Sequence, residues 1–129
     1  SYAAVDDVGV MLNPEVIEGQ IMGGVAQGLG QVLGERLTYD DQGQLLTASY
    51  MDYPMPRADM MPHMRIAHHS VACRTNPLGV KGAGESGVAG SLPSGVNAVL
   101  HALSYAGVQH LDLPYTSERV WRSIQSAQV

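Results

Sequence analysis

The feature that most constrains the fold is the stretch 14–33, which has the start, stop and spacing signals of a helix and yet contains five glycines. A helix is predicted for residues 14–33. Asn13, just before it, supplies a capping side chain, and Pro14 and Glu15 supply a first-turn proline and a first-turn acid. Gly34 then stands where a helix stops. Each internal glycine costs roughly 1 kcal/mol relative to alanine, so an isolated helix would be poor. Because glycine permits close approach of a neighbour, we expect something to pack tightly against this helix. The glycines are Gly19, Gly23, Gly24, Gly28 and Gly30.

Two rows of side chains, one apolar and one polar, run along the same predicted helix. Apolar residues recur at a spacing of four and indicate the buried face: Ile17, Ile21, Val25 and Leu29. Glutamines recur at spacings of seven and four and form a polar stripe: Gln20, Gln27 and Gln31. A glutamine stripe suits either contact with a bound ligand or hydrogen bonds to a cap or a second helix. The residues alone leave both interpretations of Gln20 open.

The remaining patterns mix short strands and helices. The 129 residues suffice for one domain, so we treat 1–129 as a single segment. We predict an α+β fold with short strands, one hairpin, ordered loops and about three helices. The strands are expected at 2–10 and 64–71, the hairpin arms at 37–39 and 45–49, the loops at 50–62 and 74–90, and the later helices at 93–106 and from Thr116, with Val120, Trp121 and Ile124 as the buried side of the last.

Charge and composition exclude several classes of protein. The net charge is -5 and no cluster of cations occurs, so we expect no nucleic-acid partner. No apolar run reaches the roughly 18 residues of a membrane span, and no signal peptide opens the chain, so we expect a cytoplasmic protein without membrane contact. Charged residues make up 15%, below the usual share of about 25%, which indicates that some of the surface faces other protein.

Three histidines and the single cysteine raise the question of a metal site. They are His63, His68, His69 and Cys73. In a strand, His69 and Cys73 would share a face, whereas His68 would point the other way. No His-Glu-x-x-His or Cys-x-x-Cys pattern is present, so we favour surface histidines and a small buried thiol. We predict no metal-ligating side chain in this segment.

The glycine-rich loop 82–87 matches the letters of a dinucleotide-binding fingerprint but not its context. No strand precedes it, and no acid follows Glu85 before Asp112. The esterase elbow fails as well, since Val88 stands where its last glycine belongs. Glu85 is the loop's one carboxylate. Held against a desolvating partner it would act as a base near neutrality, and otherwise it is a solvated acid near a helix start.

Taken together, four blocks resemble the C-terminal end of the molybdenum-binding large subunit of the xanthine dehydrogenase and aldehyde oxidase family. The bacterial branch with carbon monoxide dehydrogenase is the most similar in appearance. The blocks follow one another at fitting spacing over nearly the whole chain. They are Val5-Asp6-Asp7-Val8-Gly9 with Asn13-Pro14, then residues 18–30 (EGQIMGGVAQGLG), then residues 76–87 (NPLGVKGAGESG), and finally residues 111–121 (LDLPYTSERVW).

The resemblance implies a catalytic role for Glu85, which maps onto the family's glutamate that takes a proton during hydroxylation. It implies that Gln20 contacts the pterin, and that the backbone of Ala83 and Gly84 lies near the ligands of the metal. The implied cofactor is the molybdenum–pterin cofactor in its cytosine dinucleotide form. Iron–sulfur clusters and FAD are expected on partner subunits or domains, and the substrate is a small molecule: an aldehyde, an N-heterocycle or carbon monoxide.

The family's large subunit is several times longer than this chain. We therefore expect an inactive isolated chain, which needs the rest of the large subunit together with iron–sulfur and flavin subunits, and which associates into oligomers. The alternative function is a non-enzymatic assembly or interaction module that retains the family fold. The intact loop around Glu85 favours the enzyme.

Overall fold

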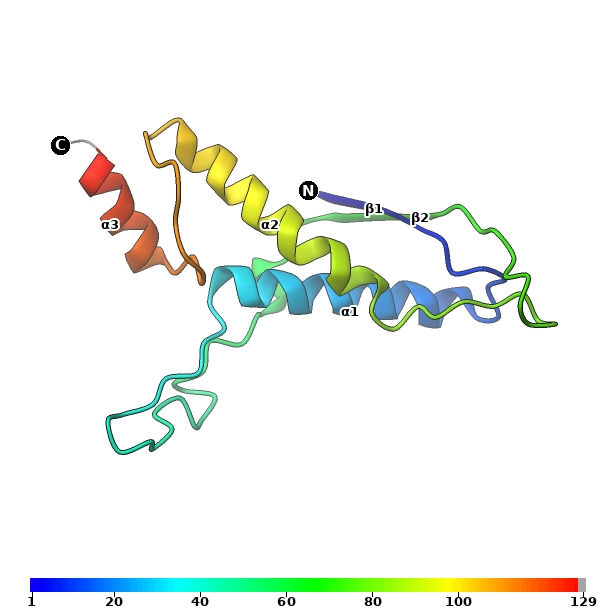
Figure 1. Cartoon of the computed structure of the whole chain (residues 1–129), viewed down its shortest axis with the longest axis horizontal. Helices are drawn as coiled ribbons and strands as arrows, with labels where there is room; N and C mark the ends of the chain where they lie inside the picture. Colours follow the sequence, from blue (N-terminus) through cyan, green and yellow to red (C-terminus); the bar gives the residue numbers. More distant parts are fainter. Residues whose placement is uncertain (128–129) are drawn as a thin grey trace.

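The computed structural model describes residues 1–127 (Figure 1). Two short strands, three α-helices and one 3₁₀ turn make up the α+β fold, which confirms the predicted fold class. In chain order they are β1 (Tyr2–Asp6), α1 (Pro14–Leu33), η1 (Ala58–Met60), β2 (Met64–His68), α2 (Ser86–Ser104) and α3 (Ser117–Ala127).

Helix α1 lies at the centre and has the predicted bounds. The Asn13 side chain accepts a hydrogen bond from Val16 N at 3.2 Å, and Gly34 N donates to Gly30 O at 3.0 Å. The start and stop signals therefore act as the sequence indicates. The apolar row supplies the core, as predicted: Ile21, Val25 and Leu29 are buried.

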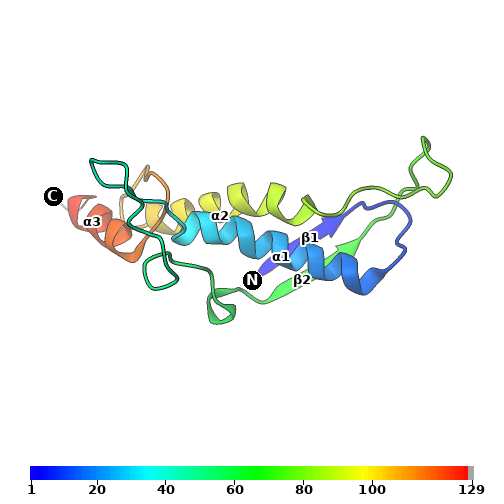
Figure 2. The same cartoon turned by 90° about the horizontal axis from the view of Figure 1, so that it is seen from below.

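Strands β1 and β2 pair in parallel, from Tyr2 opposite Met64 to Asp6 opposite His68. Parallel strands need a long crossover, and α1 with the segment that follows it provides one. The strands run opposite to α1 and α2, so their carboxyl ends and the N-termini of both helices lie at the same end of the molecule (Figure 2). The inner face of the pair packs against the α1 core through Tyr2, Ala4, Met64 and Ile66.

Helix α2 packs against α1 at backbone distance, and the glycines make this possible. A Cβ at Gly24 would lie 2.7 Å from Val88 N, and one at Gly28 would collide with Ser91. The fully buried Ser91 hydroxyl donates to Gly24 O at 3.3 Å. The predicted close neighbour of the glycine-rich helix is thus α2.

Helix α2 corrects one boundary of the sequence analysis. It begins at Ser86, not at Pro93, and so takes in the last part of the expected loop 74–90. Pro93 lies inside the helix, and two glycines precede it. These residues read as breakers in isolation, but packing against α1 compensates for their low helix propensity.

Three other expectations were only partly right. Both strands are shorter than predicted and end at Asp6 and His68. The hairpin is reduced to a single antiparallel bridge between Tyr39 and Leu45. Helix α3 starts after Thr116, whose hydroxyl accepts from Arg119 N at 3.3 Å. None of its residues is buried, so the predicted buried side is wrong: Trp121 is 61% exposed, and Val120 and Ile124 are half-buried.

Residues 35–62 leave the end of α1 as an arm that projects away from the helices before returning to β2 (Figure 1). The arm carries exposed apolar side chains, including Tyr50 at 86% and Met51 at 95%. At the same end of α1, Tyr115 N donates to Val32 O at 2.6 Å and attaches the segment before α3. None of the helices between residues 1 and 127 has the length and apolarity to cross a membrane.

Candidate functional site

The residues singled out by the sequence lie at the end of the molecule where the strands finish and both helices begin. Ligands of open α/β arrangements bind beyond the carboxyl ends of strands, where helix N-termini also supply positive potential. The side chain of Asn13 caps α1, whereas no side chain caps α2. The first backbone N–H groups of α2 thus have no capping side-chain acceptor.

Glu85 occupies the position just before the first turn of α2. Its side chain is exposed and makes no capping hydrogen bond, so the carboxylate is not engaged by its own helix. Two residues later, Gly87 packs so closely on α1 that a Cβ there would collide with the Ile21 carbonyl. Gln20, also exposed, precedes Ile21. Gln20 and Glu85 therefore flank the same contact between the two helices.

Ala83 and Gly84 form the turn that leads into Glu85. The Ala83 carbonyl accepts a hydrogen bond from the Ser86 hydroxyl at 2.9 Å, which fixes the turn. Ala83 is half-buried, whereas Gly84 is exposed. The four predicted site residues thus lie on two segments that meet at one contact between α1 and α2.

The glycines near this site fall into two groups. Those that face the other helix are required by close packing, as at Gly24 and Gly87. Others have open space beside them, since a Cβ would meet nothing within 4 Å: Gly19, Gly23, Gly82 and Gly84. None of these four has a positive φ either. No contact within the described part of the chain therefore requires glycine at these four positions.

A small hollow of about 210 Å³ lies between the loop before Glu85 and the start of α1. Val80, Lys81 and Ala83 line it on one side, and Val16 and Ile17 line it on the other. The hollow is mostly apolar and adjoins the glycine-rich turn.

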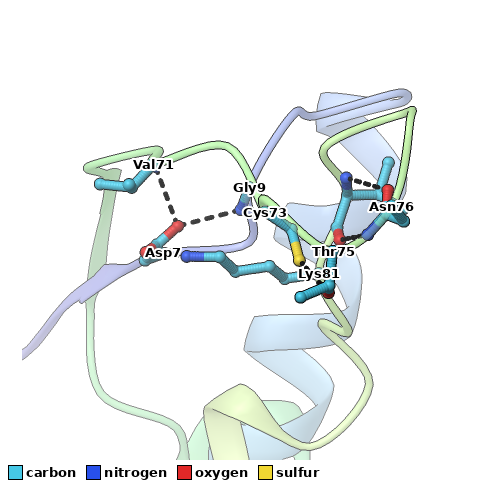
Figure 3. A network of polar contacts seen from close by, with 8 residues as sticks. Asp7, Gly9, Val71, Cys73, Thr75, Asn76 and Lys81 are labelled. Atoms are coloured by element: carbon cyan, nitrogen blue, oxygen red, sulfur yellow. Dashed lines mark hydrogen bonds and ion pairs between the residues drawn. The ribbon is translucent and has the colours of Figure 1, made fainter.

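A polar network fixes the base of the loop (Figure 3). Asp7 Oδ1 accepts from Gly9 N and Val71 N, each at 3.0 Å, and Asp7 Oδ2 pairs with Lys81. The Lys81 hydrogen bond, followed by the two N–H bonds, holds the pKa of the Asp7 carboxyl well below its usual range. Sequence analysis missed this role of Asp7, because Lys81 is 74 positions away and no spacing rule connects them.

The residues considered as metal ligands do not form a site. Within residues 1–127 no three histidine, cysteine or acidic side chains are grouped to hold a metal ion. The strand that was to align His69 with Cys73 ends at His68. Cys73 instead interacts with the Thr75 hydroxyl at 3.1 Å, and this hydrogen bond lowers the pKa of the thiol.

Asp6 and His68 face each other at the ends of the two strands. Asp6 Oδ2 and both ring nitrogens of His68 are buried and have no hydrogen-bond partner among the described residues. Buried polar atoms are seldom left without a hydrogen-bond partner in native proteins. This end of the molecule thus has hydrogen-bonding capacity that the described residues leave unused.

Comparison with known proteins finds matches over nearly the whole chain. Residues 1–62 match the family described as the molybdopterin cofactor-binding domain. The chain is 42% identical over 124 residues to the carbon monoxide dehydrogenase large chain of Hydrogenophaga pseudoflava, covering 96% of this chain and 15% of the relative. It is 44% identical over 120 residues to the nicotine 6-hydroxylase large subunit of Paenarthrobacter nicotinovorans, covering 93% and 15%.

Solved structures agree with the sequence matches. The crystal structure of quinoline 2-oxidoreductase from Pseudomonas putida 86 matches with a TM-score of 0.90 and 44% identity, over 97% of this chain and 16% of that one. A Cu,Mo-CO dehydrogenase structure matches with a TM-score of 0.89 and 33% identity, over 98% and 16%. The chain spans about 15% of the length of the curated relatives it matches.

These matches confirm the resemblance seen in the four sequence blocks. The structural matches cover 97% to 98% of the chain, as nearly complete as the sequence matches. The chain therefore belongs to the molybdenum hydroxylase family of carbon monoxide dehydrogenase, xanthine dehydrogenase and aldehyde oxidoreductase, and it corresponds to a molybdopterin cofactor-binding segment of the large subunit.

Proposed function

We propose that this segment helps to hold a molybdenum–pterin cofactor and supplies Glu85 as the base for hydroxylation of a small molecule. Gln20 is the side-chain contact to the pterin, and the backbone of Ala83 and Gly84 lies beside the metal end of the cofactor. The cofactor is in its cytosine dinucleotide form. Iron–sulfur and flavin subunits or domains receive the electrons.

The open glycines are the observation that carries this proposal. Glycine inside a helix costs about 1 kcal/mol relative to alanine, yet Gly19 and Gly23 contact nothing that would exclude a side chain. Gly82 and Gly84 have the same open space in the loop before Glu85. A bulky group that approaches the backbone on both sides of the helix contact accounts for all four, because only glycine leaves it room.

Electrostatics support an anionic occupant at this end of the molecule. The N-termini of α1 and α2 both point there, and the α2 terminus has no capping side chain. Helix N-termini attract anionic groups through their free N–H groups and dipoles. The free N–H groups at the start of α2 are therefore available to the ligands of the metal, which we place beside Ala83 and Gly84.

When bound, the cofactor supplies oxygen transfer to an electrophilic carbon of the substrate and accepts two electrons from it. The part of this chain in the reaction is to position groups and to move a proton. Glu85 takes the proton released as the new bond forms, and its carboxylate is available because it does not cap its own helix. Gln20 orients the pterin through its amide, on the opposite side of the contact between α1 and α2.

The substrate is an aldehyde, an N-heterocycle or carbon monoxide, and residues outside this segment select it. Because the segment corresponds to about 15% of its relatives' length, most of the pocket comes from the rest of the large subunit. The isolated chain is accordingly inactive.

The test is Glu85→Gln in the complete enzyme, with Glu118→Gln as the matched control at the start of α3, away from the site. Removal of a general base lowers the rate about 10²–10⁴-fold, and the nearly isosteric change leaves molybdenum and pterin content unchanged. The control keeps both activity and content. A loaded Glu85→Gln enzyme that turns over within a few-fold of wild type would refute the assignment. Absence of molybdenum from the wild-type complex would instead favour an assembly module.

A further inference from the structure

The loop that carries Glu85 is held at its base by one carboxylate from the other half of the chain. We define the Glu85 strap as residues 69–85, which run from the end of β2 to the start of α2. Asp7 contacts this strap near both ends. It accepts from Val71 N at 3.0 Å near the start and pairs with the Lys81 ammonium near the end (Figure 3).

Backbone hydrogen bonds hold the same part of the strap against the segment after β1. Lys81 N donates to Val8 O at 3.0 Å, and Val10 N donates to Gly79 O at 3.0 Å. Gly9 has a φ of 66° and lies so near the strap that a Cβ would collide with Gly79 O. A side chain at Gly9 would therefore force the two segments apart.

Within the strap, Asn76 closes the turn. Its side chain donates to Val80 O at 3.0 Å and accepts from Val80 N at 3.3 Å. This turn places Lys81 next to Asp7, and only three residues separate Lys81 from Glu85 along the chain. Hydrogen bonds thus fix the strap as far as Lys81, and a short link whose Ala83 carbonyl accepts from Ser86 connects this point to the proposed base.

We propose that Asp7 is a positioning residue for Glu85: by fixing the strap at Val71 and Lys81 it sets where the Glu85 carboxylate lies beside the cofactor. This inference rests on the proposed function. Asp7 does not touch the reacting atoms itself. Loss of Asp7 would leave the Gly9 and Val71 N–H groups and the Lys81 ammonium without their acceptor, and the strap would relax.

Displacement of a catalytic group by about 1 Å can cost about 100-fold in rate. We therefore expect Asp7→Ala in the complete, cofactor-loaded enzyme to lower kcat by about tenfold to 100-fold, with KM within about twofold of wild type. Lys81→Met removes one of the three interactions and should give a smaller loss. Asp59→Asn, which breaks the exposed Arg57–Asp59 ion pair on the arm, is the matched control and should leave kcat unchanged.

Two further measurements separate positioning from general destabilisation. The rate of hydrogen–deuterium exchange should rise about tenfold or more in peptides covering the strap, whereas the rate in α3 should stay at the wild-type value. The double variant Asp7→Ala/Glu85→Gln should be no slower than Glu85→Gln alone, because Asp7 acts through Glu85. If Asp7→Ala fails to load the cofactor, Lys81→Met is put through the same measurements and decides the question.

An unchanged exchange rate in the strap would overturn the proposal. So would a loss of rate that is undiminished on the Glu85→Gln background, since Asp7 would then act by another route. Failure of the proposed function has a different signature: Glu85→Gln would itself remain active, while the exchange experiment would still report whether Asp7 holds the strap.

Discussion

Adjacent glycines in α1 provide the sharpest test of why this helix has its composition. Gly24 faces α2, where an added Cβ would lie 2.7 Å from Val88 N and 3.0 Å from Gly87 Cα. Gly23 faces open space, where an added Cβ would meet nothing within 4 Å. Gly24→Ala and Gly23→Ala therefore make the same chemical change at neighbouring positions of one helix, with opposite steric consequences.

The expected magnitudes follow from these distances. Ordinary contact begins at 3.4 Å, so Gly24→Ala must force the two backbones apart by about 0.7 Å. Overpacking of this kind costs about 1–3 kcal/mol. Both variants gain about 1 kcal/mol in helix propensity, so that gain cancels in their difference. Gly23→Ala should raise the free energy of unfolding by up to about 1 kcal/mol, and Gly24→Ala should lie about 1–3 kcal/mol below it.

Urea unfolding of the isolated chain, followed by circular dichroism at 222 nm, gives both values. Because we expect this chain to associate, the measurements use one concentration at which sedimentation finds all variants in the same state of association. Equal slopes on urea concentration would show that the comparison reports stability alone. If Gly24→Ala were as stable as Gly23→Ala, the close approach of α1 and α2 would not explain the glycines, and the reasoning would fail.

Four other results are expected. In the complete enzyme, Gly23→Ala should lower molybdenum content although it stabilises the polypeptide, because a side chain would enter the cofactor's space; metal analysis of the purified variant checks this. Gln20→Ala should leave polar groups of the pterin unpaired and so weaken cofactor binding by about 1–3 kcal/mol, which would also lower molybdenum content. Because the folded pKa of Asp7 lies below its unfolded value, the stability that Asp7 contributes should be constant above about pH 4 and be lost in more acid solution. In acid unfolding, the difference in stability between wild type and Asp7→Asn should therefore shrink only below about pH 4. The isolated chain should associate through exposed apolar residues such as Met51, and a stable monomer in sedimentation would contradict this.

The sequence was most informative where local signals coincide. Asn13, Pro14 and Gly34 marked both ends of α1, and the spacing of its apolar residues identified the core. These features depend on neighbours along the chain, and local chemistry therefore determines them.

Features that depend on distant neighbours were missed. The start of α2 was placed too late because Gly87, Gly90 and Pro93 are poor helix formers, and only contact with α1 makes that helix favourable. One signal was available, since Gly87, Ser91 and Gly95 recur every four residues and indicate a narrow helix face. No comparable signal connected Asp7 with the strap.

The candidate site divides in the same way. Glu85 and Gln20 were proposed from motifs that stand in continuous sequence, and the structure adds the helix contact that they flank. The exposed Trp121 shows the opposite case. Its amphipathic spacing correctly indicated a helix, but among the described residues the tryptophan remains 61% exposed.

The projecting arm has a consequence for how the chain tolerates change in length. Its two ends are fixed separately, by the Glu35 N bond to Gly30 O at one side and the Tyr2 N bond to His63 O at the other. Entropy of loop closure rises by only about 0.6 kcal/mol for each doubling of length. In the isolated chain, insertions at the turn around Gly43 would therefore leave the helices and the strap undisturbed, which makes this turn a suitable position for a tag or a spectroscopic label.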